Sequence, residues 1–460
     1  MKKKMRLGMF IYPGGHHFAG WRHKTTPASR LSSLDFYVNV ARLAERGKFD
    51  LLFIGDQLNA REKNGRFFGR QTSSNLDPIS LLSALSAVTN NIGLVATLST
   101  TYNEPYAIAN KFATLDHLSN GRAGWNIVTT MDDRAALNFS RSAAMEKTDR
   151  YIRGREFVDV CTSLWDSWGD DALKRDDGKS RFCDTSLIAP IRHRGESFNV
   201  EGPLRLPRPV QGWPVLVQAG GSPQGIEFAA LVAEVIFTAQ TDIDPARTFR
   251  NTIHEKLARY GRRPEDLAIM PGLSPLIGST EAEVFRLEEE LSDLLHPELA
   301  MWTVSHLFQF PLDQYGPDEK LPYEEIRKAK KMQSAAEAVL SNSQRQQLTI
   351  AQTAREIARS RTHGNFAGTP DQFVAHVENW MSEGACDGFN IMPPYFPSQM
   401  EVFVDQVVPL LQKKHILREE YDGRTLRDNL GFARPARNHF KKLLSKGGLS
   451  EAIEGRAGAA

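Results

Sequence analysis

Short apolar runs alternate with amphipathic segments along most of the 460 residues. The stretch "DLLFIGD" at 50–56 is apolar almost throughout, as expected for a strand covered on both faces. In "LDPISLLSALSAV", Asp77 and Pro78 stand where an N-cap and a first helical residue belong, and Leu81 and Leu85 share one face. Eight strands, each followed by a helix, are expected at 6–11, 50–56, 91–99, 121–129, 213–219, 234–239, 266–272 and 387–392.

This order of elements predicts an α/β fold. Alternating strands and helices build parallel sheets, and eight such units favour a (β/α)8 TIM barrel, with an open doubly wound sheet as the alternative. A barrel of this kind needs about 250 residues. The barrel domain is therefore expected at 1–414, with insertions at about 130–212 and 280–362 and a C-terminal extension at 415–460. The second insertion shows no obvious strand and is expected to cover the active site with aromatic side chains such as Trp302, Phe308 and Phe310.

Charge and cysteine content exclude several classes of protein. The chain has 57 basic and 55 acidic residues, a formal charge of +2, and lacks the extended basic patches typical of nucleic-acid binders. No run of eighteen apolar residues and no signal peptide stands out, so neither a membrane nor secretion is expected, and the protein is expected in the cytoplasm. Three cysteines far apart in sequence form neither a disulfide framework nor a zinc motif.

Residues at the carboxyl ends of barrel strands face the active site. This rule selects polar but mostly uncharged groups together with aromatic rings: Phe10, His16, His17, Trp21, Phe53, Asp56, Thr97, Asn126, Gly221 and Ser222. The usual motifs of serine hydrolases, zinc peptidases and nicotinamide enzymes are absent from the sequence. His16 and His17 are adjacent, so they would point to different sides, and no metal site is expected.

The stretch "PVLVQAGGSPQG" at 214–225 joins an apolar strand to a helix through two glycines and a serine. Backbone N–H groups at such a helix start point toward an anion. Together with the uncharged donors and aromatic rings, this favours a flat cofactor with a phosphate tail. Structural interpretations stay open: an ordinary tight turn here, a loop cap for Asp56, an inward barrel position for Thr97 and a helix-surface position for Tyr151.

Several long motifs resemble one family. "GRAGWNIVTT", "DRYIRGREFVDVCTSLWDSW", "HRGESFNVEGPL", "PVLVQAGGSPQG" and "FAGTPDQFVAHVENW" are similar to the nitrilotriacetate monooxygenase group of bacterial-luciferase-like flavin monooxygenases. The resemblance extends from about residue 6 to about residue 430 and is weakest over 280–362. It implies a (β/α)8 barrel with insertions that binds FMN at the carboxyl end of the barrel.

Site residues follow from the resemblance, motif by motif. Asp56, Thr97, Tyr151 and Ser222 are expected to contact FMN, the last two near its phosphate, with Gly221 and Asn126 beside them. Lys147 stands where the family usually has a histidine and can pair with phosphate as a point charge. Residues expected to handle the substrate are Phe10, His16, His17, Trp21 and Phe53.

The resemblance also implies an activity. A separate NAD(P)H:FMN reductase supplies reduced FMN, and O2 is used to oxygenate a small organic substrate, often with cleavage of a C–N, C–S or C–halogen bond. A homo-oligomer, dimer or tetramer, is expected. The alternatives are a deazaflavin-dependent dehydrogenase of the same superfamily and a flavin-binding protein without turnover. The near-neutral charge does not favour a polyanionic substrate over an apolar, sulfur-containing or halogenated one.

Overall fold

Eight parallel strands close into a barrel. The computed structural model describes residues 4–63, 65–70, 72, 76–174, 180–329 and 334–446. The strands follow one another around the ring in chain order, β13 pairs with both β11 and β1, and the ring closes. They are β1 (Arg6–Ile11), β2 (Leu51–Ile54), β5 (Gly93–Ser99), β6 (Ala123–Val128), β9 (Val215–Gln218), β10 (Val235–Thr238), β11 (Ala268–Ile277) and β13 (Gly388–Ile391). The predicted barrel is confirmed, and the open sheet was the wrong alternative.

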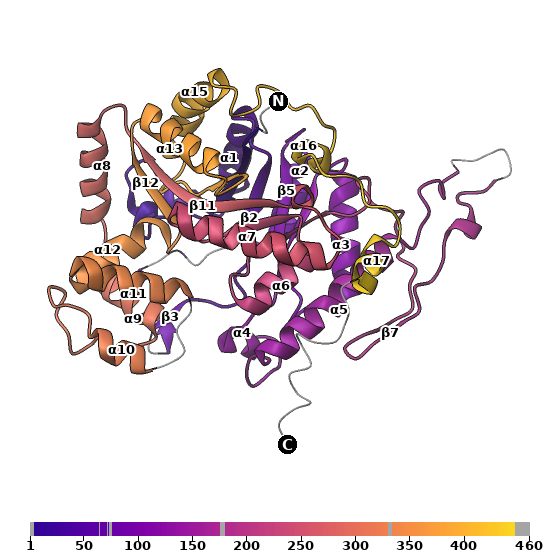
Figure 1. The fold of residues 1–460 in the computed structure, drawn as a ribbon, viewed down its shortest axis with the longest axis horizontal. Helices are drawn as coiled ribbons and strands as arrows, with labels where there is room; N and C mark the ends of the chain where they lie inside the picture. Colours follow the sequence, from indigo (N-terminus) through magenta and orange to yellow (C-terminus); the bar gives the residue numbers. More distant parts are fainter. Residues whose placement is uncertain are drawn as a thin grey trace.

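An outer ring of helices covers the strands, as Figure 1 shows. Asp77 caps α2 as expected, because its carboxylate accepts the Ser80 N–H at 2.7 Å. Among the described residues, none of the helices has both the length and the hydropathy of a membrane-spanning segment. The covering helices are α1 (Leu34–Arg46), α2 (Pro78–Ser86), α3 (Pro105–Leu118), α5 (Lys147–Trp165), α6 (Pro223–Val232), α7 (Ile243–Arg259), α13 (Pro370–Ser382), and α14 (Ser398–Val402) continued through a π turn into α15 (Val408–Lys413).

The first predicted insertion is shorter than expected. α5 packs between α3 and α6 and is therefore the barrel helix that follows β6. Trp125 and Trp165 are fully buried, and Cys161 lies on the inner face of α5 as a buried free thiol. The remainder contains the short pair β7 (His193–Arg194) and β8 (Asn199–Val200), in a segment that extends away from the barrel (Figure 1).

The second insertion builds a helical cap, which we define as α9 (Pro297–Phe308), α10 (Tyr323–Ala329), α11 (Ser334–Gln346) and α12 (Ile350–Ser360). Along the chain, the cap and the preceding helix α8 (Glu281–Asp293) lie between β11 and a short strand, β12 (Gly364–Gly368). The cap has its own apolar core, which includes Phe308 and receives Phe18 and Phe68 from barrel loops. Trp302 stacks on Phe68 with ring centroids 4.7 Å apart. The cap is thus fixed to the loops at the carboxyl ends of the strands.

Short strands outside the barrel were not predicted. β12 extends the outer half of β11 in parallel, with Leu273 opposite Gly364. β3 (Glu62–Lys63) and β4 (Arg66–Phe67) form a small antiparallel pair after β2, and α4 (Asp133–Leu137) follows β6.

The C-terminal extension closes the opposite end of the barrel. Its helix α16 (Leu426–Leu430) inserts Leu426 and Leu430 among strand residues such as Leu51 and Val95. Arg418 forms an ion pair with the buried Asp50 at the start of β2. The extension ends in α17 (His439–Lys446), and residues 447–460 lie outside the described residues. Leu426 and Leu430 of the extension are therefore part of the apolar core inside the barrel.

Leu426→Ala is expected to lower the free energy of unfolding by about 3 kcal/mol. Leu426 is fully buried, and its truncation leaves a cavity against Gly93 and Gly124, which have no side chains to fill it. Urea unfolding followed by circular dichroism measures the change. Leu118→Ala, at a leucine that is 58% exposed on α3, is the control and should stay within about 0.5 kcal/mol of the parent. Equal effects of the two substitutions would contradict this placement of the extension.

Candidate active site

Three phenylalanine rings meet at the carboxyl ends of the strands. Phe10 on β1 lies 5.0 Å from Phe53 on β2 and 5.6 Å from Phe237 on β10, measured between ring centroids. Phe53 and Phe237 lie 5.4 Å apart, so the three rings close the barrel interior at this end. We call them the aromatic floor. Such a surface suits the face of a flat, weakly polar ring system.

Beside this floor, β5 and β6 place two polar side chains next to each other. Thr97 and Asn126 are directly paired in the strand register, and the Asn126 amide donates to the Thr97 hydroxyl at 2.9 Å. Both residues are buried, and the Asn126 Oδ1 has no hydrogen-bond partner among the described residues. A buried acceptor without a partner is unfavourable by about 1–3 kcal/mol. Asn126 is therefore suited to accept a hydrogen bond from a ligand.

Asp56 lies just beyond β2, half-buried, in a hollow that Phe10 and Tyr12 also line. Burial raises the pKa of this carboxyl to about 6, opposed by a hydrogen bond from the Gln57 N–H and reinforced by the charge of Asp77. Asp56 can therefore exist in both protonation states near neutral pH. This property suits a group that meets a polar edge of a ligand.

On the β9 side, α5 and α6 form a second polar region. Ser222 is the N-cap of α6, and its hydroxyl accepts the Gly225 N–H at 3.2 Å. The Tyr151 hydroxyl lies against the same turn, because a Cβ placed on Gly225 would be 3.0 Å from it. Nothing lies within 4 Å of a Cβ placed on Gly221, so the space in front of the helix start is open. A helix N-terminus with two hydroxyls and free space is suited to bind a phosphate.

Lys147 is the first residue of α5, one turn before Tyr151, and is exposed. Residues four apart share a helix face. Its ammonium group can therefore approach an anion held at Tyr151.

His16 and His17 point in different directions, as their adjacency predicts. His16 is fully buried, its ring is 4.7 Å from that of Phe10, and its Nε2 donates to the Phe10 carbonyl at 2.9 Å. Burial lowers the pKa of His16 well below its usual range, and the charge of Arg361 adds to this effect. His16 is therefore a neutral group beside the aromatic floor.

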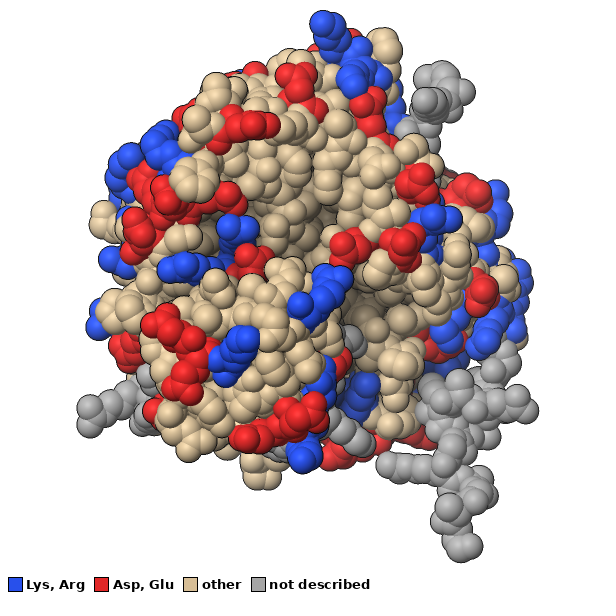
Figure 2. Space-filling view, turned by 60° about the vertical axis from the view of Figure 1, so that its left-hand side comes forward, with Lys and Arg blue, Asp and Glu red and all other residues tan. Residues whose placement is uncertain are grey.

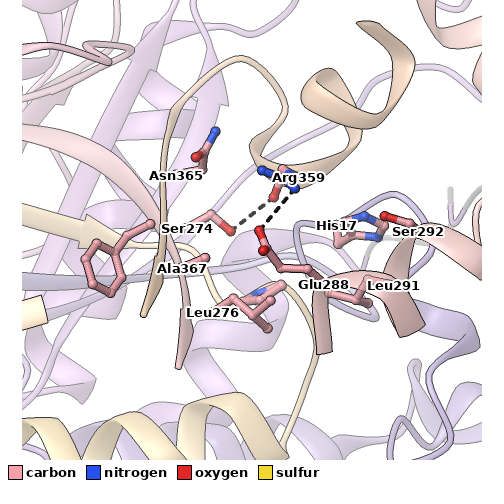
Figure 3. Close-up of a pocket in the computed structure, with 11 residues that line it drawn as sticks. His17, Ser274, Leu276, Glu288, Leu291, Ser292, Arg359, Asn365 and Ala367 are labelled. Atoms are coloured by element: carbon pink, nitrogen blue, oxygen red, sulfur yellow. Dashed lines mark hydrogen bonds and ion pairs between the residues drawn. The ribbon is translucent and has the colours of Figure 1, made fainter. Parts of the chain in front are cut away.

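His17 lies in a different pocket, shown in Figure 3, between β11, β12 and α8. Its Nδ1 accepts the Ala19 N–H at 3.1 Å, and burial together with Arg361 and Arg359 lowers its pKa to about 3. An ion pair between Glu288 and Arg359 at 3.0 Å crosses this pocket. The two histidines do not meet, and no group of three metal-binding side chains occurs among the described residues.

Trp21 packs against a different apolar cluster from the one that contains the aromatic floor. Its side chain packs against Gly14, where a Cβ would come within 2.6 Å of the Trp21 Cβ. The indole Nε1 is buried and has no hydrogen-bond partner among the described residues. The structure thus brings Phe10, Phe53 and His16 together and separates Trp21 and His17 from them.

Several residues at the barrel mouth, the opening at the carboxyl ends of the strands, were not predicted. Phe237 is the fourth residue of "EVIFTA", as Phe53 is the fourth residue of "DLLFIG", so this pattern could have indicated Phe237. His363 stacks on Phe237 at 4.8 Å, and Arg361 lies over the Tyr12 ring at 4.0 Å. Arg361 and His363 follow a cap helix rather than a barrel strand, and no strand-end rule selects them. In Figure 2 the surface is hollowed near the centre of the view, with basic and acidic side chains mixed around the hollow.

Comparison with known proteins gives one family. The model of the luciferase-like monooxygenase family matches residues 5–386. N-acetyl-S-(2-succino)cysteine monooxygenase of Bacillus subtilis (strain 168) is 43% identical over 441 residues, which are 96% of this chain and 99% of the relative. Nitrilotriacetate monooxygenase component A of Aminobacter aminovorans is 42% identical over 442 residues, with 94% and 97% covered.

Solved structures agree with this match. DmoA from Hyphomicrobium sulfonivorans superposes with a TM-score of 0.85 at 28% identity, covering 100% of this chain and 99% of that chain. Long-chain alkane monooxygenase (LadA) gives a TM-score of 0.82 at 28% identity, with 94% and 96% covered. The chain therefore belongs to the luciferase-like monooxygenase family, flavin-dependent enzymes that use O2 to oxygenate small organic molecules.

Proposed function

We propose that FMN is the flavin of this monooxygenase, with its phosphate at the start of α6 and its ring system over the aromatic floor. The observation that carries the proposal is the convergence of Ser222, Tyr151 and the open space at Gly221 on one helix N-terminus. A phosphate there gains hydrogen bonds from backbone N–H groups and side-chain hydroxyls and a favourable interaction with the helix dipole. Lys147 adds a positive charge on the same side of the mouth.

The remaining contacts fit the ring system. Around the barrel, β5 with Thr97 and β6 with Asn126 lie between β2, which Asp56 follows, and β9, which leads to Ser222. The two side chains would therefore face the part of the cofactor between its ring and its phosphate. The unpartnered Asn126 oxygen would accept a hydrogen bond from the ring or the ribityl chain. Reduced FMN supplies the electrons that activate O2. The protein would position the ring and exclude water, and His16 would present a neutral imidazole beside the floor.

We further infer that reduced FMN comes from a separate NAD(P)H:FMN reductase, which would place the activity in the cytoplasm. One relative is named component A of its monooxygenase. The pristinamycin IIA synthase of Streptomyces pristinaespiralis has two different polypeptides that match, one at 40% identity over 94% of this chain and the other at 30% identity over 56% of it. Multi-component organisation among relatives supports a reductase partner, and the homo-oligomer stays a prediction.

Ser222→Ala and Tyr151→Phe are each expected to weaken FMN binding about tenfold, because a hydrogen bond to a charged group contributes about 1.5–3 kcal/mol and about 1.4 kcal/mol corresponds to a factor of ten. Riboflavin has no phosphate, so its affinity should change little. Fluorescence titration of each variant with both flavins gives the dissociation constant of riboflavin divided by that of FMN. The proposal requires this ratio to be smaller in both variants than in the parent.

The matched control is Thr280→Ala. Thr280 caps α8 as Ser222 caps α6, accepting the Glu283 N–H at 3.2 Å, and lies away from the proposed site. The Thr280→Ala variant should lose a similar helix cap, and its affinity for FMN and for riboflavin should stay unchanged. Equal losses for FMN and riboflavin in the Ser222 and Tyr151 variants would show that the phosphate binds elsewhere.

A further inference from the structure

Two arginine side chains, Arg61 and Arg361, surround Tyr12 at the β1 side of the mouth, and we call them the arginine pair. The Arg361 guanidinium lies between two rings, 4.0 Å from the Tyr12 centroid and 4.3 Å from that of Phe18. Its Nε donates to the His16 carbonyl at 3.1 Å. These contacts fix the plane of the guanidinium.

Arg61 approaches the same tyrosine from the segment after β2. Its Nη2 donates to the Tyr12 hydroxyl oxygen at 3.3 Å, and that hydroxyl donates to the Thr72 carbonyl at 3.2 Å. The Arg61 Nε is buried and has no partner among the described residues. Both guanidiniums therefore lie around one phenol ring, and one of them retains an unused buried donor.

Neither member of the arginine pair has an acidic partner. Within the described residues, no carboxylate lies within 4.0 Å of Arg61 or Arg361, whereas Arg359, two residues earlier, pairs with Glu288 and Glu356. Arg70, in the same segment as Arg61, pairs with Glu298 at 3.2 Å. Two neighbouring, half-buried positive charges without a counterion are unfavourable unless an anion joins them.

The positive charge persists at neutral pH. Burial lowers the pKa of Arg361 to about 10, with Arg61 contributing in the same direction and Tyr12 opposing, so Arg361 stays protonated. Burial raises the pKa of Tyr12, but the charges of Arg361 and Arg61 outweigh it and give a net lowering. Both nearby histidines are held neutral, since burial and Arg361 lower the pKa of His16 and that of His363, the latter to about 4. An anion at the arginine pair would relieve this repulsion.

The backbone also holds Arg361 in an unusual conformation. Arg361 has φ 53° and ψ 44°, and Thr362 follows with φ 70°. Two successive non-glycine residues in the left-handed region are disfavoured and persist where the surrounding structure fixes them. Here they direct the side chain back over Tyr12.

The arginine pair lies across the mouth from the proposed phosphate site. Around the ring, β9 is separated from β1 by β2, β5 and β6 on one side and by β10, β11 and β13 on the other. The flavin phosphate therefore belongs to one side and the arginine pair to the other, with the aromatic floor between them. Tyr12 and His16 connect the pair to the floor, with their rings 5.8 Å apart.

We propose that Arg61 and Arg361 bind a carboxylate of the substrate, so that the molecule oxygenated over the aromatic floor is an organic acid. Guanidinium groups pair with carboxylates through two parallel hydrogen bonds, which fix orientation as well as charge. The inference rests on the proposed function, because it requires the flavin ring to lie between the two anion sites.

The test uses full-length protein loaded with FMN and two matched probes, succinate and succinamide, which differ in charge but little in shape. Isothermal titration calorimetry should show that succinate binds at least about 30-fold more tightly. Arg61→Gln and Arg361→Gln should each weaken succinate binding about tenfold or more and leave succinamide unchanged. Arg70→Gln is the matched control and should change neither probe. Unfolding midpoints establish whether each variant is folded. If the Arg361→Gln variant is not folded, the result for Arg61→Gln decides the outcome.

Equal affinity for the two probes, or an equal loss in Arg70→Gln, would overturn the proposal. Weaker binding of FMN but not of riboflavin in Arg61→Gln would also overturn it, because the arginine pair would then hold the cofactor phosphate. The flavin ratio in Ser222→Ala judges the cofactor site independently. Failure of the carboxylate site can therefore be distinguished from failure of the FMN site.

Discussion

Gly221→Val is expected to weaken FMN binding by at least about 100-fold with no loss of stability. Gly221 is exposed, and a Cβ built on it would meet nothing within 4 Å. The fold therefore tolerates a side chain there, but the valine would fill the space in front of α6 that the phosphate needs. Loss of two or more charged hydrogen bonds, each about 1.5–3 kcal/mol, gives the expected magnitude. FMN titration and urea unfolding of the same preparation measure both quantities.

Gly69→Val is the matched control for this substitution. Gly69 is exposed, and a Cβ built on it also meets nothing within 4 Å, but it lies in the segment after β4, away from α6. The control should bind FMN as the parent does. Unchanged FMN affinity in Gly221→Val would place the phosphate elsewhere, and a parallel loss of stability would assign the effect to folding.

Gly388→Ala is expected to lower the free energy of unfolding by more than about 4 kcal/mol. Gly388 opens β13 opposite Arg6 of β1, with φ +153°. A Cβ there would overlap the Arg6 carbonyl oxygen and lie 2.6 Å from the carbonyl carbon, so strands β13 and β1 would have to separate. Substitutions that force the backbone apart are among the few that lower the free energy of unfolding by more than about 4 kcal/mol. Urea unfolding and recovery of folded protein measure it.

Gly384→Ala separates the clash from backbone strain. Gly384 has φ +65° and nothing within 4 Å of a built Cβ, so alanine there meets only the left-handed penalty of about 1–2 kcal/mol. A Gly388 variant that unfolds at the same urea concentration as the Gly384 variant would contradict the close seam between β1 and β13.

The barrel could be predicted from the sequence because each strand is an apolar run bounded by turn residues. All eight predicted strands correspond to barrel strands, and the helix after Asp77 begins at Pro78 as expected. β12 was missed because "GNFAG" has two glycines and only one large apolar residue. The position of Leu426 inside the barrel has no local pattern, since burial by distant strands leaves no periodic signal in a five-residue helix.

The candidate site was predictable to the extent that it lies at strand ends. Thr97 and Asn126 are adjacent because their strands pair in register. That His16 and His17 point to different sides could be predicted because the two residues are adjacent. The position of His17 could not, because its pocket lies between β11, β12 and α8, and the position of α8 and β12 is not determined by the ends of the barrel strands. Arg361 belongs to the part of the site that could not be predicted. It reaches the mouth from the end of α12 and contacts the carbonyl of His16, which lies 345 residues earlier in the chain. Roles in handling cofactor or substrate stay predictions for all twelve residues: Phe10, His16, His17, Trp21, Phe53, Asp56, Thr97, Asn126, Lys147, Tyr151, Gly221 and Ser222.

FMN is proposed to lie across the barrel mouth with its phosphate at the start of α6, and a crystal structure of the complex with FMN decides whether it does. We expect phosphate density within hydrogen-bond distance of the Ser222 and Tyr151 hydroxyls, with the isoalloxazine ring over Phe10 and beside Asn126. Phosphate density at Arg61 and Arg361 instead, or bound deazaflavin with no affinity for FMN, would overturn this placement of the cofactor.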